Sequence, residues 1–187
     1  MKIHIKYDIN LACKIILQEQ LELLGADYQI TGLGEVDIKN NLSKDQYQKL
    51  STNLKKYGID IIEHPKSVLI QKIKDTIVDL VYLQEKLPNS NISTYLAEKL
   101  NHSYGYLSNL FSELTFSSIE NFIILQKIER AKQLIIANEL TLTEIAWQLN
   151  YSSVAHLSNQ FKKTTGLTPT AFQRIIKNRN DSDSTDK

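Results

Sequence analysis

The feature that most constrains this chain is an internal repeat in its C-terminal half. Residues 94–111 read TYLAEKLNHSYGYLSNLF, and residues 143–161 read TEIAWQLNYSSVAHLSNQF. Both copies contain Thr, Ala, Leu-Asn, Ser, Leu-Ser-Asn and Phe in that order, and the second has one more residue in its middle. Farther on, Ile119 and Phe122 correspond to Pro169 and Phe172. A chain with this repeat is expected to fold twice into the same local unit.

Each copy predicts a helix-turn-helix. A first short helix presents apolar residues to a core, namely Leu96, Ala97 and Leu100 in one copy and Ile145, Ala146 and Leu149 in the other. Asn101 and Asn150 fall at the turn, where Asn tolerates the left-handed conformation. Ser103 in the first copy, and Ser152 or Ser153 in the second, can cap the next helix. These second helices, at about 104–114 and 153–163, have the pattern of helices that enter the major groove of DNA.

A long helix separates the two copies. Residues from about 118 to 137 place apolar side chains at Phe122, Leu125, Ile128, Leu134 and Ile135. A helix of roughly 19 residues spans about 28 Å at 1.5 Å per residue. Two recognition helices held apart on that scale can enter successive major grooves, about 34 Å apart. A single chain would then read two half-sites.

Four motifs relate this half of the chain to a known family. They are IERAKQLI at 128–135, LTEIA at 142–146, NYSS at 150–153 and, most specific, LSNQFKKTTGLTP at 157–169. With them, residues 90–177 resemble the DNA-binding domain of the AraC/XylS transcription regulators. The resemblance implies a sequence-specific DNA-binding transcription regulator, with double-stranded operator DNA as its partner and an effector that the sequence does not identify.

The same resemblance implies which residues contact DNA. In the first recognition helix the base-reading positions are Tyr104, Gly105, Tyr106, Ser108 and Asn109, and in the second they are Val154, Ala155, His156 and Asn159. Ser153 joins this set at the start of the second helix. Phosphate contacts are implied for Lys162, Lys163 and the amide end near Thr168, in keeping with the role of lysine in neutralising phosphates.

The chain departs from that family in its charges. Neither recognition helix contains Arg, which reads guanine through two hydrogen bonds in many members. The first copy has Ser112-Glu113 where the second has Lys162-Lys163, and Phe116 replaces the glycine that matches Gly166. We therefore expect residues 152–168 to supply most of the affinity, and the first unit to add register and modest specificity.

Several residues also have a purely structural interpretation. His156 and Asn159 can be ordinary exposed polar side chains, and Tyr104 and Tyr106 can pack on the neighbouring turn. Trp147 is expected in the core. Arg130 is expected to pair with Glu129 or another nearby acid rather than with DNA.

The N-terminal third mixes strand and helix patterns. Ile3, Ile5 and Tyr7 alternate with polar residues as in a half-buried strand. A helix over 10–24, a hairpin of strands at 27–31 and 33–39, a helix over 44–56 with a Ser43–Gln46 capping box and a short strand at 59–62 follow. The order β-α-β-β-α-β predicts a ferredoxin-like domain over residues 1–64, and hence an α+β chain.

The segment YDINLAC at 7–13 also resembles the first loop of a heavy-metal-associated domain. That loop carries two cysteines, whereas this chain has Asn10 at the first position and Cys13 at the second. One thiolate is a poor site for a soft metal, and His4 and His64 cannot be placed beside it from sequence. Cys13 is expected as a buried helix residue, with a metal-handling protein as the alternative function and no cofactor expected. The domain would then sense another signal or mediate dimerisation.

A connecting helix is expected over 65–87. Its residues Ile70, Ile73, Ile77 and Leu80 form an apolar stripe that either packs on its own domain or joins two copies in a homodimer. Pro88 to Asn91 breaks the chain, so the boundary of the DNA-binding domain, residues 88–178, is expected there. The polar tail at 179–187 is expected to be disordered.

Charge and composition narrow the function classes. Residues 86–180 carry 10 basic against 6 acidic residues, whereas residues 1–85 carry 11 against 12 and the last seven carry one against three. No segment approaches the ~20 apolar residues of a membrane span, and a single cysteine allows no internal disulfide. A cytoplasmic location without membrane contact fits. We find no nucleophile–histidine set, paired carboxylates or phosphate loop, so an enzyme is not expected.

Overall fold

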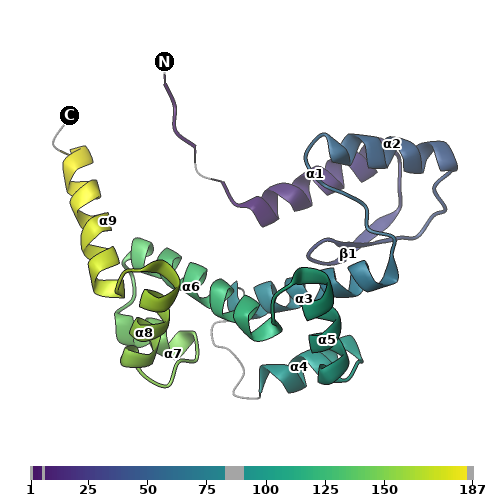
Figure 1. Ribbon diagram of the computed structural model, residues 1–187. Coiled ribbons are helices and arrows are strands. Elements are labelled where there is room, and N and C mark those ends of the chain that lie inside the picture. Colours follow the sequence, from purple (N-terminus) through teal and green to yellow (C-terminus); the bar gives the residue numbers. More distant parts are fainter. Residues whose placement is uncertain (1, 6, 83–90, 185–187) are drawn as a thin grey trace. The chain divides into compact units, whose positions relative to one another are not determined.

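The computed structural model describes residues 2–5, 7–82 and 91–184. The chain divides into two compact units, Met1–Leu69 and Ile70–Lys187, which we call the N-terminal unit and the helical unit and describe separately. Figure 1 labels most of the described elements. In order they are α1 (Ile9–Leu23), β1 (Tyr28–Gly32), β2 (Glu35–Ile38), α2 (Lys44–Lys55), α3 (Pro65–Tyr82), α4 (Ile92–Leu100), α5 (Tyr104–Thr115), α6 (Ile119–Ala137), α7 (Leu142–Gln148), α8 (Val154–Thr165) and α9 (Pro169–Ser184).

The N-terminal unit consists of two helices and one antiparallel hairpin. Asp8 caps α1 by accepting hydrogen bonds from the amides of Asn10 and Leu11. The hairpin pairs Tyr28 with Ile38 and turns through Gly34, whose φ of 63° is left-handed. The capping box that starts α2 forms as predicted. A small core of Leu21, Leu50 and Leu54 joins the helices to the hairpin.

In the described residues the predicted outer strands of this unit do not form, so the ferredoxin-like fold is not shown. Ile3, Ile5 and Tyr7 are 70%, 80% and 76% exposed and belong to no strand. Residues 59–62 also lack regular structure, although Ile59 and Ile61 pack against the core. Alternating side chains favour a strand only where a neighbouring strand accepts its backbone hydrogen bonds. In the described residues the sheet has two strands, and the resemblance to a heavy-metal-associated domain is not supported.

Helix α3 differs from the predicted connector. The boundary between the two compact units falls at Leu69/Ile70, inside this helix, whereas the domain boundary predicted at residue 88 lies among residues 83–90, outside the described part. Its apolar stripe is buried in the single chain, with Ile73 0%, Ile77 1% and Leu80 2% exposed. The stripe therefore packs within its own chain, the first of the two alternatives, and does not form an open surface for a second copy.

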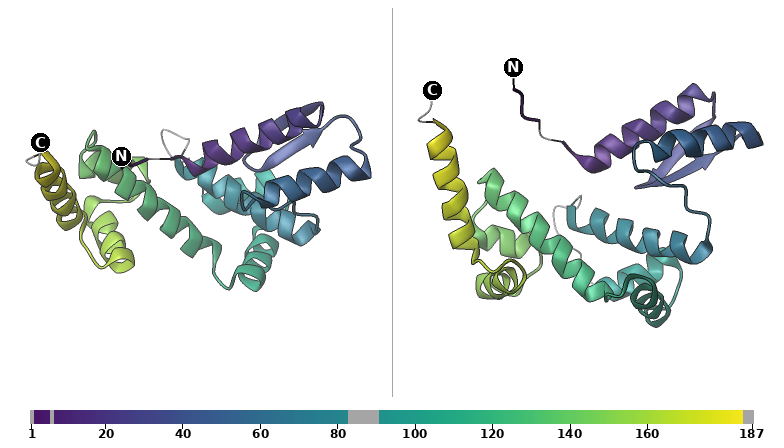
Figure 2. Two further views of the ribbon diagram at one scale, coloured as in Figure 1. Left: turned by 90° about the horizontal axis from the view of Figure 1, so that it is seen from above. Right: turned by 45° about the horizontal axis from the view of Figure 1, so that its top comes forward.

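The helical unit is built around α6. Figures 1 and 2 show α6 running from the α4–α5 pair to the α7–α8 pair, with α9 following α8. Ile128, Ala131 and Ile135 of α6 are buried, so its inner face holds the two pairs in one unit. Helix α9 continues through Ser184, where the sequence predicted a disordered tail from residue 179. Propagation of an established helix adds one hydrogen bond per residue, which extends α9 beyond its apolar segment.

Candidate nucleic-acid interface

The sequence repeat appears as two helix-turn-helix units, α4–α5 and α7–α8, with matching turns. Asn101 and Asn150 both adopt the left-handed conformation, with φ of 54° and 55°. Ser103 accepts a hydrogen bond from the amide of Tyr106 at 3.3 Å, and Ser153 accepts one from the amide of His156 at 3.0 Å. Both predicted turn residues and the Ser103 cap are confirmed, and Ser153 rather than Ser152 caps α8.

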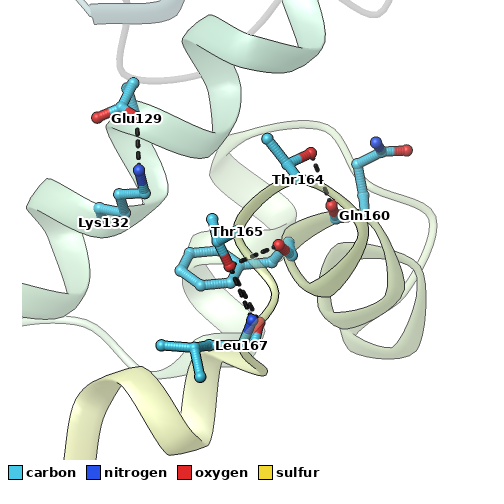
Figure 3. Close-up of polar contacts among 7 residues, drawn as sticks. Glu129, Lys132, Gln160, Thr164, Thr165 and Leu167 are labelled. Carbon is cyan, nitrogen blue, oxygen red and sulfur yellow. Dashed lines mark hydrogen bonds and ion pairs between the residues drawn. The ribbon is translucent and has the colours of Figure 1, made fainter. Parts of the chain in front are cut away.

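The match extends past each second helix. The rings of Phe111 and Phe122 lie 5.7 Å apart, and those of Phe161 and Phe172 lie 5.6 Å apart. The hydroxyl of Thr165 lies 2.8 Å from the Phe161 carbonyl and 3.2 Å from the Leu167 carbonyl (Figure 3). Thr115 makes the same pair of contacts in the first unit. These bonds fix how each second helix ends and where α6 and α9 begin.

Helix α8 presents a polar face away from its core. Leu157 and Phe161 are buried, whereas an exposed row follows the opposite side of the helix: Ala155, His156, Asn159, Lys162 and Lys163. Val154 and Ser158 are half-buried beside this row. The spacing of one, four, seven and eight residues from the first member places the row on one side of a helix. The structure thus brings together the exposed residues predicted for the second unit.

The ring of His156 is held in place by two residues of the preceding turn. It meets the Tyr151 ring edge-on at 5.2 Å, and its Nδ1 lies 3.0 Å from the hydroxyl of Ser152. The ammonium of Lys127, on α6, lies over the Tyr151 ring, 5.2 Å from its centre. Nε2 of His156 makes no hydrogen bond within the described residues, so it is the ring nitrogen that can meet a ligand.

Tyr151, which supports the His156 ring, and Lys127, which lies over Tyr151, are desolvated by burial. Burial raises the pKa of Tyr151 to about 12, and it lowers the pKa of Lys127. The Tyr151 hydroxyl is buried with no hydrogen-bond partner in the described residues. Neither Tyr151 nor Lys127 was predicted as part of the site; Tyr151 stood only in a family motif, and Lys127 gave no sequence signal because its role depends on packing of α6 against the turn.

Helix α5 presents a less charged face. Gly105, Tyr106 and Asn109 are exposed, and Ser108 is half-buried. Tyr106 packs its ring 5.2 Å from His102 of the preceding turn, as the packing alternative expected, yet stays 46% exposed. In place of the two lysines of α8, α5 carries exposed Ser112 and Glu113. A pair of exposed lysines is therefore present in one unit and absent at the same place in the other.

Tyr104 is oriented differently from the other predicted readers. Its hydroxyl donates a hydrogen bond to Glu120 in the first turn of α6. Burial, followed by that carboxylate, raises the pKa of Tyr104, and the hydrogen bond from Tyr104 lowers the pKa of Glu120. The hydroxyl of Tyr104 is thus engaged inside the protein, and this side chain connects α5 to α6.

Two helix starts flank the recognition helices. Thr168 accepts a hydrogen bond from the amide of Ala171 at 3.2 Å at the start of α9, and Ser118 accepts one from Asn121 at 3.1 Å at the start of α6. Gly166 and Phe116 end α8 and α5 in left-handed conformations with φ of 80° and 55°. Positive helix ends next to Lys162 and Lys163 favour an anion.

Two expectations, Trp147 in the core and Arg130 paired with Glu129, are wrong. Trp147 is 60% exposed on α7 rather than in the core, because the buried side of this short helix is taken by Ile145 and Ala146. Arg130 does not pair with Glu129, which binds Lys132 at 2.6 Å (Figure 3).

The guanidinium of Arg130 instead lies 5.6 Å from the ring centre of Tyr82 and donates to Gln133. This stacking of a cation on an aromatic ring ties α6 to α3 inside the helical unit. The sequence separation between the two helices explains why local pairing rules pointed to the wrong partner.

Cys13 lies half-buried on α1, one turn after the start of that helix. Across the described residues, no three His, Cys, Asp or Glu side chains gather to hold a metal ion. Within that same part of the chain no helix is both long and apolar enough to cross a bilayer.

Comparison with known proteins agrees with the repeated architecture. Residues 96–175 match the family model described as a helix-turn-helix domain. The chain is 28% identical over 113 residues to an uncharacterised transcriptional regulator, YdiP, of Escherichia coli, which covers 60% of this chain and 35% of the relative. It is 31% identical over 83 residues to the Msm operon regulatory protein of Streptococcus mutans, over 44% of this chain and 30% of that protein.

A solved structure is similar over the same region. The C-terminal domain of AraT, a response regulator from Geobacillus stearothermophilus, aligns with a TM-score of 0.51 and 26% identity, covering 60% of this chain and 88% of that domain. The chain spans about a third of the length of the two curated relatives. The sequence match and the duplicated fold agree that residues 96–175 form a helix-turn-helix domain.

Proposed function

We propose that this chain is a sequence-specific DNA-binding transcription regulator that inserts α5 and α8 into successive major grooves. The observation that carries the proposal is the duplicated helix-turn-helix, with its two second helices at opposite ends of the 19-residue helix α6. A helix of that length spans about 28 Å, close to the ~34 Å repeat of the major groove. Such a regulator acts where the chromosome is, in the cytoplasm.

In this proposal α8 provides most of the affinity. Lys162 and Lys163 neutralise phosphates, and the start of α9 at Thr168 adds backbone amides. His156 and Asn159 reach base edges through hydrogen bonds, and Asn can pair with adenine through two of them. Ser153, Val154 and Ala155 lie at the leading end of the helix, where small side chains allow close approach to a thymine methyl group.

Helix α5 contributes register and modest specificity. Gly105 permits close approach of the helix to DNA, and Tyr106 and Asn109 are the exposed side chains that can meet bases, with Ser108 beside them. Tyr104 supports this helix from α6 through Glu120 and is assigned a positioning role. The missing lysines in this unit reduce its share of the phosphate contacts.

Selection of bound DNA from a random duplex library by the full chain tests the proposal. We expect an enriched sequence with two half-sites about 10 base pairs apart, and a gel-shift affinity that falls steeply with salt. The half-site bound by α8 should tolerate fewer base changes than the half-site bound by α5. Enrichment of no sequence at low salt, or binding of all duplexes with equal affinity, would contradict sequence-specific regulation.

We further propose that the N-terminal unit mediates sensing or self-association. It exposes large apolar side chains on α1 and on the segment before it: Ile3, Ile5, Tyr7, Ile9, Leu11, Ile15 and Leu23. Clustered exposed apolar surface is typical of an interaction site. Sedimentation velocity of the full chain tests self-association, with a dimer at tens of micromolar expected and a monomer at the same concentration contradicting it.

A further inference from the structure

A cavity of about 420 Å³, open to solvent, lies on the helical unit beside the first recognition helix. Its walls are residues 91–93 at the start of α4, Tyr104 at the start of α5, and Glu120, Ile123 and Ile124 on the first turns of α6. This volume falls within the range of small-molecule sites, roughly 300–1,000 Å³. The cavity touches Tyr104, whose hydroxyl donates a hydrogen bond from α5 to Glu120 of α6.

The walls combine one negative charge with an apolar surface. Ile92, Ile123 and Ile124 are half-buried hydrocarbon, and Asn91 and Ser93 add polar edges. Among the described lining residues, Glu120 alone bears a charge. The hydrogen bond from Tyr104 lowers the pKa of Glu120, so its carboxylate is ionised at neutral pH. A carboxylate next to hydrocarbon complements a ligand with a cationic end and an apolar body.

The second unit lacks this combination. Counting along the repeat, Thr170 takes the place of Glu120, and Val154 takes the place of Tyr104. The paired helix starts, caps and Phe contacts are otherwise the same in both units. The carboxylate and its phenol partner are therefore an addition specific to the first unit and are not required by the helix-turn-helix fold.

We infer that this cavity binds a small amphipathic amine, whose ammonium group donates to Glu120 and whose hydrocarbon part packs on Ile123 and Ile124. The ammonium competes with the Tyr104 hydroxyl for the same carboxylate. Because Tyr104 is the first residue of α5, loss of that hydrogen bond changes how the recognition helix is held. The effect on DNA rests on the proposed function, whereas the binding site itself does not.

Three probes of matched shape separate charge from hydrocarbon: phenethylamine (cation), 2-phenylethanol (neutral) and phenylacetate (anion). Ligand-observed NMR titrations with the full chain are expected to show phenethylamine binding at least about tenfold more tightly than 2-phenylethanol, as for a hydrogen bond to a charged group. Phenylacetate is expected to bind most weakly. Equal affinities for the three probes, or no phenethylamine binding, would overturn the site.

Variants locate the binding. Glu120→Gln keeps an acceptor for Tyr104 but removes the charge, and is expected to reduce phenethylamine affinity to that of 2-phenylethanol. Glu139→Gln makes the same charge change at an exposed residue outside the cavity and is expected to leave the affinity unchanged. Tyr104→Phe frees the carboxylate and is expected to raise the affinity for phenethylamine. If Glu120→Gln does not fold, Tyr104→Phe alone provides the test. Equal binding by wild type and the cavity variants would place the amine elsewhere.

The link to DNA is measured separately. Gel shifts of the wild-type chain on its selected duplex, with and without saturating phenethylamine, are expected to differ in affinity by severalfold, and Glu120→Gln is expected to abolish that difference. Amine binding without any DNA binding would refute the proposed function and leave the site intact. DNA binding that the amine does not alter would overturn the coupling through Tyr104.

Discussion

The ring of Tyr151 meets the imidazole of His156 edge-on, with the ring centres 5.2 Å apart. The first unit has a ring pair at the same two positions with the residue types exchanged: His102 in the turn lies 5.2 Å from Tyr106 in the helix, with the two rings tilted by 41° rather than edge-on. In both units an aromatic residue of the turn therefore orients an exposed ring on the recognition helix. A ring held in this way loses less side-chain entropy when it meets a base.

Replacing His156 by Ala is expected to reduce affinity for the selected duplex by about 1–3 kcal/mol, the worth of a good contact to a base edge. Affinity for unrelated duplex DNA should change little, since the lysines remain. Gel-shift titrations on both duplexes give the two values. His64→Ala, which alters an exposed His of the N-terminal unit, serves as the control. An equal loss on both duplexes would mean that His156 contacts backbone rather than bases.

The lysine pair of α8 is expected to control salt dependence. Lys162 and Lys163 are both exposed, so replacing both by Ala removes two charges without disturbing the core. The plot of log K against log salt has a negative slope, and each lost phosphate contact is expected to make it shallower by about 0.9. The adjacent exposed pair Lys55 and Lys56, also changed to Ala, is the charge-matched control. If the slope becomes shallower by the same amount in both double variants, the phosphate contacts lie elsewhere.

The ends of α5 and α8 allow a paired test of stability. Gly166→Ala is expected to destabilise the protein by about 1 kcal/mol, because Ala disfavours the left-handed φ of 80° although its Cβ would meet no neighbour.

Phe116→Gly is expected to stabilise the protein by roughly 0.5–1 kcal/mol, because glycine adopts the left-handed φ of 55° without strain. The side chain that is lost is 95% exposed. Urea unfolding followed by circular dichroism measures both changes. A destabilised Phe116→Gly would show that this ring makes a stabilising contact.

The helical unit was predictable because its boundaries carry local signals. Asn101 and Asn150 mark left-handed helix ends, Ser103 and Ser153 mark helix starts, and the repeat allows each assignment to be checked against its copy. The exposed row on α8 follows from helical spacing once Leu157 and Phe161 are assigned to the core. These features depend on residues within a few positions of one another.

Features that depend on distant partners were not predictable. Ile3 and Ile5 have the alternation of a strand, but no strand among the described residues pairs with them. Arg130 stacks on Tyr82 from a different helix, and the hydroxyl of Tyr104 turns to Glu120 rather than outward. Periodicity states which side chains share a face, but it does not identify what lies opposite that face.

The buried phenol of Tyr151 gives the protein a measurable sensitivity to alkali. Its folded-state pKa is about 12, above the ordinary value near 10, so the unfolded chain releases this proton first as pH rises. Between about pH 10 and 12 the wild type is therefore expected to lose up to about 1.4 kcal/mol of stability per pH unit relative to Tyr151→Phe. Below pH 10 the variant should be as stable as the wild type or more so, because it removes a buried hydroxyl without a partner in the described chain and keeps the ring against His156. Urea unfolding of both proteins from pH 8 to 11 measures the difference, and parallel pH profiles would show that Tyr151 ionises as readily in the folded protein as in the unfolded chain.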